Sequence, residues 1–120
     1  MPRVLIVDDS PTETYKFKEI LEKNGYEIIT ADNGADGVAV ARQELPDVVL
    51  MDVVMPGLNG FQATRQISKN AETKDIPVII VTTKDQETDK VWGKRQGASD
   101  YLTKPVDETL LLETIQRVLG

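Results

Sequence analysis

Five short aliphatic runs, separated by stretches with helical spacing, constrain this sequence more than any other feature. The runs cover residues 4–7, 26–31, 48–51, 78–81 and 99–102. Three of them are nearly continuous in Val, Ile, Leu and Met rather than alternating with polar residues, which indicates strands buried on both faces of a parallel sheet. Parallel neighbours need long crossover connections, so we expect helices on both faces of that sheet.

The first segment between runs has a clear helix start and stop. Ser10, Pro11 and Glu13 predict a capping box with proline at the first helical position. Gly25 comes four positions after Leu21, the last apolar residue of the segment, and suits the helix end. The sequence therefore predicts a helix between the first two strands.

Four later segments are also predicted to be helices. Asn33 and Asp107 have side chains suited to cap the second and the fifth helix, and Pro46 ends the second. On their own, the aromatic residues Trp92 and Tyr101 are most simply interpreted as core residues. The second helix is indicated by Val38, Ala41 and Leu45, which are predicted to be buried, and the third by Gly60, Ala63, Thr64 and Ile67. The fourth is indicated by Thr88, Val91, Trp92 and Arg95, and the fifth by Leu111, Ile115 and Val118, which are predicted to face inward.

Five βα units in strict alternation predict an α/β fold with a doubly wound, five-stranded parallel sheet. We expect the flavodoxin-like (βα)5 strand order 2-1-3-4-5, with helices on both faces. The 120 residues suit one ordinary domain, so the expected organisation is a single domain over residues 1–120 without an output domain.

Composition excludes several classes of function. The net charge of −6 disfavours nucleic acid and anionic membranes as partners. The chain has no cysteine and no histidine, which excludes disulfides, thiolate zinc sites and Ser-His-Asp catalysis. No apolar run is long enough for a signal peptide or a membrane span, and we expect a cytoplasmic protein.

Polar residues follow four of the five predicted strands. Asp8 and Asp9 follow the first, Asp52 the third, Thr82 the fourth and Lys104 the fifth. A single aspartate after a strand is most often a helix cap, and a single lysine is most often a surface charge. In a doubly wound sheet, however, the carboxyl ends of the strands form the ligand site, so we expect these five side chains to meet there.

Three carboxylates at one sheet edge need a cation. At separations of about 4 Å each pair repels by roughly 4 kcal/mol at an effective dielectric constant near 20. Hard oxygen donors without His or Cys favour Mg²⁺ over softer metals. A carboxylate, a hydroxyl and an ammonium around that ion suit phosphoryl transfer to an aspartate, which gives an acyl phosphate.

Four segments resemble the signature segments of response-regulator receiver domains, and together they span nearly the whole chain. They are residues 5–10, 49–57, 80–83 and 97–105. The resemblance implies that Asp52 is the phosphoacceptor in a protein that is not an enzyme but assists its own phosphorylation and dephosphorylation. It also implies Mg²⁺ held by Asp9, Asp52 and the Val54 backbone carbonyl, with Asp8 acting through water.

The resemblance further implies a switch. Lys104 would hold the phosphoryl oxygens, and a cis Lys104–Pro105 peptide would place it. Thr82 would be the switch hydroxyl and Tyr101 the switch aromatic, which turns inward behind it. Val54 and Lys84 occupy positions that tune the lifetime of the acyl phosphate. The output would be a downstream protein bound to the face formed by the fourth helix, the fifth strand and the fifth helix.

Segments 57–66 and 83–97 are similar to stand-alone receivers of type IV pilus chemosensory systems. This similarity implies a CheA-like histidine kinase as phosphodonor and control of twitching motility as output. We expect a monomer.

Other functions stay open. A flavodoxin-like carrier shares the topology, but Asp8 and Asp9 would repel a flavin phosphate. A magnesium-dependent phosphohydrolase with an aspartyl nucleophile normally has a DxD pattern at that nucleophile. A phosphate sink or relay for the kinase uses the same site as a switch, and the chain could also be a fragment of a larger regulator.

Overall fold

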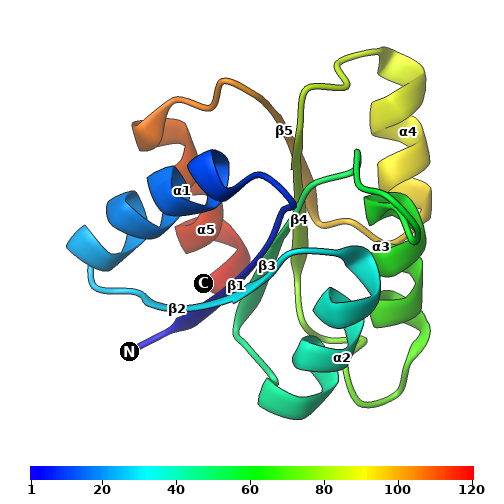
Figure 1. The fold of residues 1–120 in the computed structure, drawn as a ribbon, viewed down its shortest axis with the longest axis horizontal. Helices are drawn as coiled ribbons and strands as arrows, with labels where there is room; N and C mark the ends of the chain where they lie inside the picture. The colour runs from blue at the N-terminus through cyan, green and yellow to red at the C-terminus, as the bar shows by residue number, and fades with distance from the viewer.

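The predicted parallel sheet forms the centre of the protein, described here by a computed structural model of residues 1–120 (Figure 1). The strands pair in the order β2-β1-β3-β4-β5, which confirms the predicted flavodoxin-like topology. Their ends lie within one residue of those predicted. The strands are β1 (Arg3–Val7), β2 (Glu27–Ala31), β3 (Val48–Met51), β4 (Val78–Thr82) and β5 (Asp100–Thr103).

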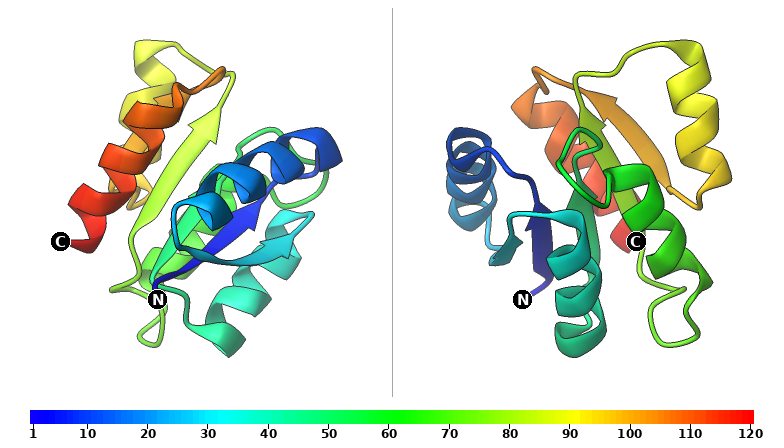
Figure 2. Two further views of the ribbon diagram at one scale, coloured as in Figure 1. Left: turned by 90° about the vertical axis from the view of Figure 1, so that its left-hand side faces the viewer. Right: turned by 45° about the vertical axis from the view of Figure 1, so that its right-hand side comes forward.

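Five helices cover both faces of the sheet, as the alternation predicts. In the left view of Figure 2, α1 and α5 lie on the face of the sheet turned toward the reader, and the right view brings α2, α3 and α4 forward. None of the helices is long and apolar enough to cross a bilayer. The helices are α1 (Pro11–Lys23), α2 (Gly34–Glu44), α3 (Gly60–Lys69), α4 (Glu87–Arg95) and α5 (Glu108–Leu119).

Alternate residues of the central strands point into two separate apolar cores. In β1, Val4 and Ile6 pack with Phe17 and Leu21 of α1, in the core that α5 completes. The neighbouring Leu5 and Val7 point the opposite way, into the core closed by α2 and α3. Because both faces are apolar, the strands have the continuous hydrophobic pattern seen in the sequence.

Leu45 and Trp92 differ from the sequence-based expectation. Leu45 is 55% exposed rather than buried, because it ends α2 in a left-handed conformation (φ 46°). The following Pro46 disfavours a helical conformation at Leu45, and it is Pro46 that is buried. Trp92 is 50% exposed because α4 turns Gly93, its only buried residue, toward the sheet.

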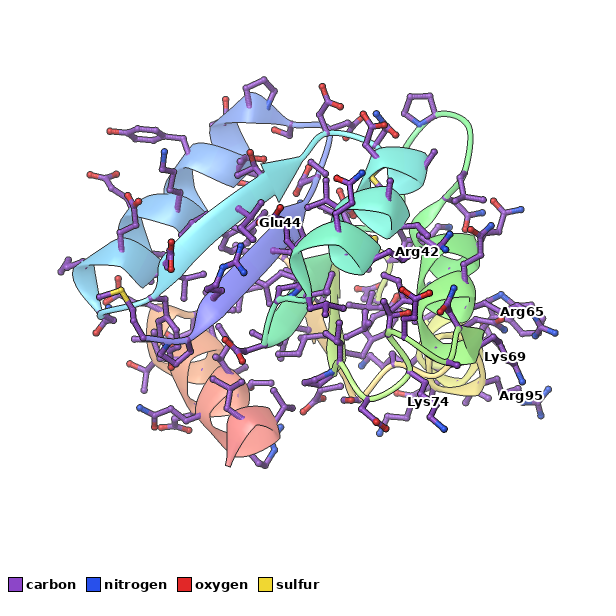
Figure 3. The ribbon with its side chains drawn as sticks, turned by 90° about the horizontal axis from the view of Figure 1, so that it is seen from below. Arg42, Glu44, Arg65, Lys69, Lys74 and Arg95 are labelled. Carbon is purple, nitrogen blue, oxygen red and sulfur yellow. The ribbon has the colours of Figure 1, made fainter.

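Positive side chains gather around the ends of the helices on the α2–α4 face. Arg42, Lys69 and Arg95 lie in the last turns of α2, α3 and α4, where a cation offsets the negative end of the helix dipole. Figure 3 shows Lys69 and Arg95 on the same side of the molecule as Arg65 and Lys74. The net negative charge is therefore unevenly distributed, and the site lies at the opposite edge of the sheet, where helices begin.

Candidate functional site

Three carboxylates meet where β1 and β3 end. Val7 pairs with Met51, so the residues that follow them, Asp8 and Asp52, leave the sheet side by side. Oxygen atoms of Asp8, Asp9 and Asp52, hereafter the acidic cluster, all lie within 4.8 Å of one another. Asp8 and Asp52 are buried and Asp9 is exposed, so the cluster is open to solvent on one side.

Backbone N–H groups orient the two buried carboxylates. The N–H of Ser10 donates to Asp8 Oδ1 at 2.9 Å, and the N–H of Val53 donates to Asp52 Oδ1 at 2.7 Å. Each bond fixes one carboxylate oxygen and so orients the second oxygen of the same carboxylate. The set contains only hard oxygen donors with access to water, which suits Mg²⁺.

Lys104 brings the positive charge of the site. Its Nζ donates to Asp8 Oδ2 at 2.8 Å and to Asp52 Oδ2 at 3.4 Å. The Lys104–Pro105 peptide is cis, as the resemblance implied, and the Lys104 N–H donates to the Thr82 carbonyl at 2.8 Å. The side chain is only 10% exposed, so this ammonium is a buried charge rather than a surface one.

The charges at the site perturb one another. Burial raises the pKa of Asp52; the nearby Lys104 ammonium lowers it and Asp8 raises it, while hydrogen bonds from Thr82 and Val53 act against the rise. Burial lowers the pKa of Lys104, but the hydrogen bond to Asp8 and the surrounding carboxylates outweigh that effect and raise it. The ammonium therefore stays charged at neutral pH.

The two residues expected to form a switch, Thr82 and Tyr101, are both buried. Thr82 is fully buried at the end of β4. Tyr101 on β5 is 9% exposed, and its hydroxyl donates to the Lys84 carbonyl at 2.8 Å, so the ring already lies inward. Burial, followed by the charges of Asp89, Asp52 and Asp85, raises the pKa of Tyr101 to about 12.

The loop after β3 brings α3 against the backbone of Asp52. A Cβ at Gly60 would lie 1.9 Å from the Asp52 carbonyl oxygen, so only glycine fits where α3 begins. Val54 lies in this loop with its side chain 56% exposed. Its carbonyl as a metal ligand stays a prediction.

Glu13 is the residue that the sequence-based reasoning placed in the wrong role. Its N–H donates to Ser10 Oγ at 3.3 Å, which is half of the predicted capping box. Its carboxylate does not return to the Ser10 N–H, which Asp8 has taken; instead Oε1 lies 3.5 Å from Lys104 Nζ. A glutamate at this position satisfies both patterns, so local spacing alone could not distinguish them.

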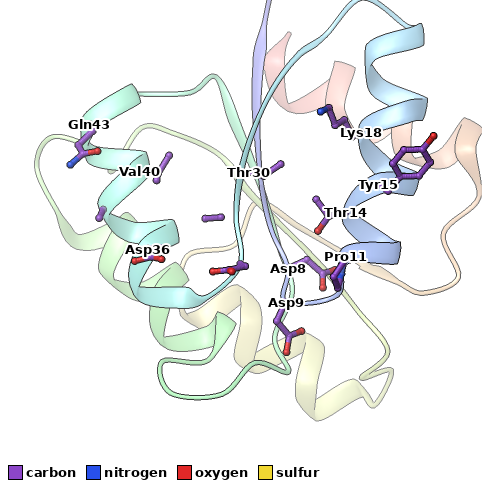
Figure 4. Close-up of a pocket in the computed structure, with 13 residues that line it drawn as sticks. Asp8, Asp9, Pro11, Thr14, Tyr15, Lys18, Thr30, Asp36, Val40 and Gln43 are labelled. Carbon is purple, nitrogen blue, oxygen red and sulfur yellow. The ribbon is translucent and has the colours of Figure 1, made fainter.

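A groove leads away from the acidic cluster. Its volume is about 780 Å³, and it runs between α1 and α2 along the edge strand β2 (Figure 4). Asp8 and Asp9 lie at one end, while Asp52, Thr82 and Lys104 do not line it. The groove therefore borders the site without containing its reactive centre.

Comparison with known proteins defines the class. The response regulator receiver domain family matches residues 4–116, and the chain belongs to this family. The receiver domain is a module of two-component signalling. One relative is Protein PilH of Pseudomonas aeruginosa, which is 76% identical over 120 residues that make up all of this chain and 99% of the relative.

Solved structures agree with this assignment. Chemotaxis protein CheY4 of Vibrio cholerae superposes with a TM-score of 0.93 at 36% identity, over 99% of both chains. The receiver domain of sensor histidine kinase PA1611 from Pseudomonas aeruginosa has a TM-score of 0.92 at 29% identity, over 99% of this chain and 98% of that one. That structure has a magnesium ion coordinated in its active-site cleft.

Proposed function

We propose that this protein accepts a phosphoryl group on Asp52 from a histidine kinase, with Mg²⁺ bound at the acidic cluster. The observation that carries the proposal is the position of the Asp52 carboxylate, which has an oxygen within 4.8 Å of oxygens of Asp8 and Asp9 and has its Oδ2 3.4 Å from Lys104 Nζ. A nucleophile, a cation site and a fixed ammonium close to one another are what phosphoryl transfer requires.

The transfer forms one bond and breaks another. A carboxylate oxygen of Asp52 bonds to phosphorus as the P–N bond of the donor phosphohistidine breaks and its electron pair returns to the imidazole nitrogen. Lys104 neutralises the charge on the transferred oxygens, and the Thr82 hydroxyl donates to one of them. Both groups are buried near Asp52 before the donor arrives, so each needs only a short movement to reach the phosphoryl oxygens.

Mg²⁺ would be held by Asp9, Asp52 and the Val54 carbonyl, with Asp8 acting through water. When bound, the ion offsets the repulsion between the carboxylates and the incoming phosphoryl oxygens. The exposed carboxylate of Asp9 leaves one side of the cluster accessible from solvent. The PA1611 receiver, with magnesium in its cleft, supports this assignment.

We place the output on α4, β5 and α5. Lys104 is tied to Thr82 through the backbone, and Tyr101 is tied to the segment before α4 through Lys84. Val91 and Trp92 are each about half exposed on α4, and Val91 lines a groove of about 340 Å³ that reaches Tyr101. Movement of Thr82 toward a phosphoryl group would therefore change the conformation of an exposed, partly apolar face that suits a protein partner.

The similarity to PilH supports a role in type IV pilus control and twitching motility. A CheA-like kinase would be the phosphodonor, and we expect the protein to act as a cytoplasmic monomer. Phosphotransfer from a panel of purified bacterial kinases would test this role, because the cognate kinase should transfer its phosphoryl group fastest.

One observation favours a phosphate sink as a second candidate. The Tyr101 ring already lies inward, with its hydroxyl bonded, so phosphorylation has less distance left to move it. Amide shifts with beryllofluoride and Mg²⁺ distinguish the two functions. Shifts that extend to β5 and α4 support a switch, whereas shifts confined to the surroundings of Asp52 support a sink.

The metal site has its own test. Calorimetric titration of Mg²⁺ should give weaker binding in Asp9→Asn and in Asp52→Asn than in the wild type, because each substitution removes a carboxylate from the cluster. Undiminished binding in both variants would exclude the proposed site.

A further inference from the structure

Lys104 contacts three carboxylates, and only two of them belong to the acidic cluster. Its Nζ lies 2.8 Å from Asp8 Oδ2, 3.4 Å from Asp52 Oδ2 and 3.5 Å from Glu13 Oε1. Glu13 comes from the first turn of α1 and is not among the clustered carboxylates. The ammonium is therefore shared between the metal site and a carboxylate outside it.

A divalent cation and this ammonium compete for the same carboxylates. Asp8 and Asp52 are ion-paired with Lys104 and also belong to the cluster that would hold the cation. Two positive centres at such short range repel, so a cation that enters the cluster must weaken the Lys104 contacts. Losing them outright would leave a buried ammonium without a partner, which is strongly unfavourable.

Glu13 is free to take the ammonium over. Its carboxylate does not cap α1, because the Ser10 N–H already donates to Asp8. Its side chain is 28% exposed, and Lys104 is the only cation within ion-pair distance of it. The Lys104 backbone is fixed to Thr82, so a small movement of Nζ would exchange Asp8 and Asp52 for Glu13.

We infer that Glu13 is a positioning residue that holds the Lys104 ammonium when a divalent cation occupies the acidic cluster. This inference rests on the proposed function, since it requires a cation at the cluster. Glu13 then has two effects. It lowers the cost of admitting the cation, and it keeps the ammonium beside Asp52, where the phosphoryl oxygens arrive.

The test is a double-mutant cycle on Mg²⁺ affinity, measured by calorimetry in wild type, Glu13→Gln, Lys104→Met and the double variant. We expect Glu13→Gln to weaken Mg²⁺ binding roughly threefold to tenfold when Lys104 is present. Glu13→Gln should have almost no effect on the Mg²⁺ affinity in the Lys104→Met background, because no ammonium is then present that needs a carboxylate partner. Equal effects in both backgrounds would show that Glu13 acts only through its charge, and would overturn the inference.

Two controls avoid reliance on the Lys104 variant, should it fold poorly. Glu13→Asp keeps the charge but shortens the reach toward Lys104, so it should weaken Mg²⁺ binding as Glu13→Gln does. Glu19→Gln removes an exposed carboxylate of the same helix and should leave the affinity unchanged. An affinity of Glu13→Asp equal to that of the wild type would contradict the inference.

A direct observation completes the test. The ¹⁵N resonance of the Lys104 side chain should move on Mg²⁺ addition in the wild type and move differently in Glu13→Gln. If the wild type bound no Mg²⁺, the proposed function would fail together with the inference. If it bound Mg²⁺ and the effects of the two substitutions added, only the inference about Glu13 would fail.

Discussion

Replacing Lys104 with methionine would remove the one cation among three carboxylates. At 2.8, 3.4 and 3.5 Å, each ion pair is worth roughly 5–6 kcal/mol of Coulomb energy at an effective dielectric constant near 20. Desolvation of the charges cancels much of this gross attraction. Removing one partner of a buried pair leaves the desolvation cost without the attraction, and it typically costs about 3–5 kcal/mol. We expect a loss of that size.

Urea unfolding at pH 7, followed by circular dichroism, measures this loss. With a slope of about 2 kcal/mol per molar urea, the midpoint should fall by roughly 1.5–2.5 M. Lys18→Met is the matched control, because Lys18 is exposed and forms no ion pair, and its effect should stay within about 0.5 kcal/mol. Mg²⁺ should stabilise Lys104→Met more than the wild type, because the ion replaces the missing charge without competing with an ammonium.

The pH dependence of this contribution has a definite sign. The pKa of Lys104 is raised in the folded state, so its stabilising effect is complete below the ordinary value of 10.5 and is lost as the pH rises through the folded value. The deficit of Lys104→Met should therefore persist throughout neutral pH. A loss of less than about 1 kcal/mol at pH 7 would refute the account of Lys104 as a buried, paired charge.

Three further changes test other parts of the site. Asp52→Asn should stabilise the fold at neutral pH, because the raised pKa of Asp52 means that ionisation of this carboxyl opposes folding. The gain in stability should disappear as the pH falls below the ordinary value of 3.8, and a gain that stays constant with pH would contradict this explanation. Gly60→Ala should lower the free energy of unfolding by about 2 kcal/mol despite the better helix propensity of alanine, because the alanine Cβ would clash with the Asp52 backbone. An unchanged melting temperature would argue against this packing. The difference in ultraviolet titration between wild type and Tyr101→Phe should be centred at about 12, and a centre near 10 would show an exposed phenol.

The fold and most of the site could be predicted because strand burial and strand ends leave direct traces in the sequence. A parallel strand buried on both faces must be apolar throughout, so the first polar residue marks its end. Asp8 and Asp52 stand at such ends, Lys104 directly follows the edge strand β5, and the strand order brings the three together. The topology is therefore enough to predict which side chains meet at the site, and their chemistry indicates the reaction.

The remaining details depend on contacts that sequence spacing does not determine. An α-helix turns by about 100° per residue, so a difference of one position decides whether Gly93 or Trp92 faces the sheet. Gly93 packs there because a Cβ would meet Ile80 and Tyr101 at 2.9–3.0 Å, a tertiary constraint. Glu13 likewise turned to Lys104, 91 positions further along the chain, rather than to its own helix end.

Locating the phosphoryl group tests the central claim most directly. The protein would be incubated with acetyl phosphate, reduced with borohydride to trap the acyl phosphate, digested and mapped by mass spectrometry. We predict one modified residue, Asp52, with labelling that requires Mg²⁺ and disappears in Asp52→Asn. A label that persists in Asp52→Asn, or one that forms equally well with the metal chelated, would contradict the account.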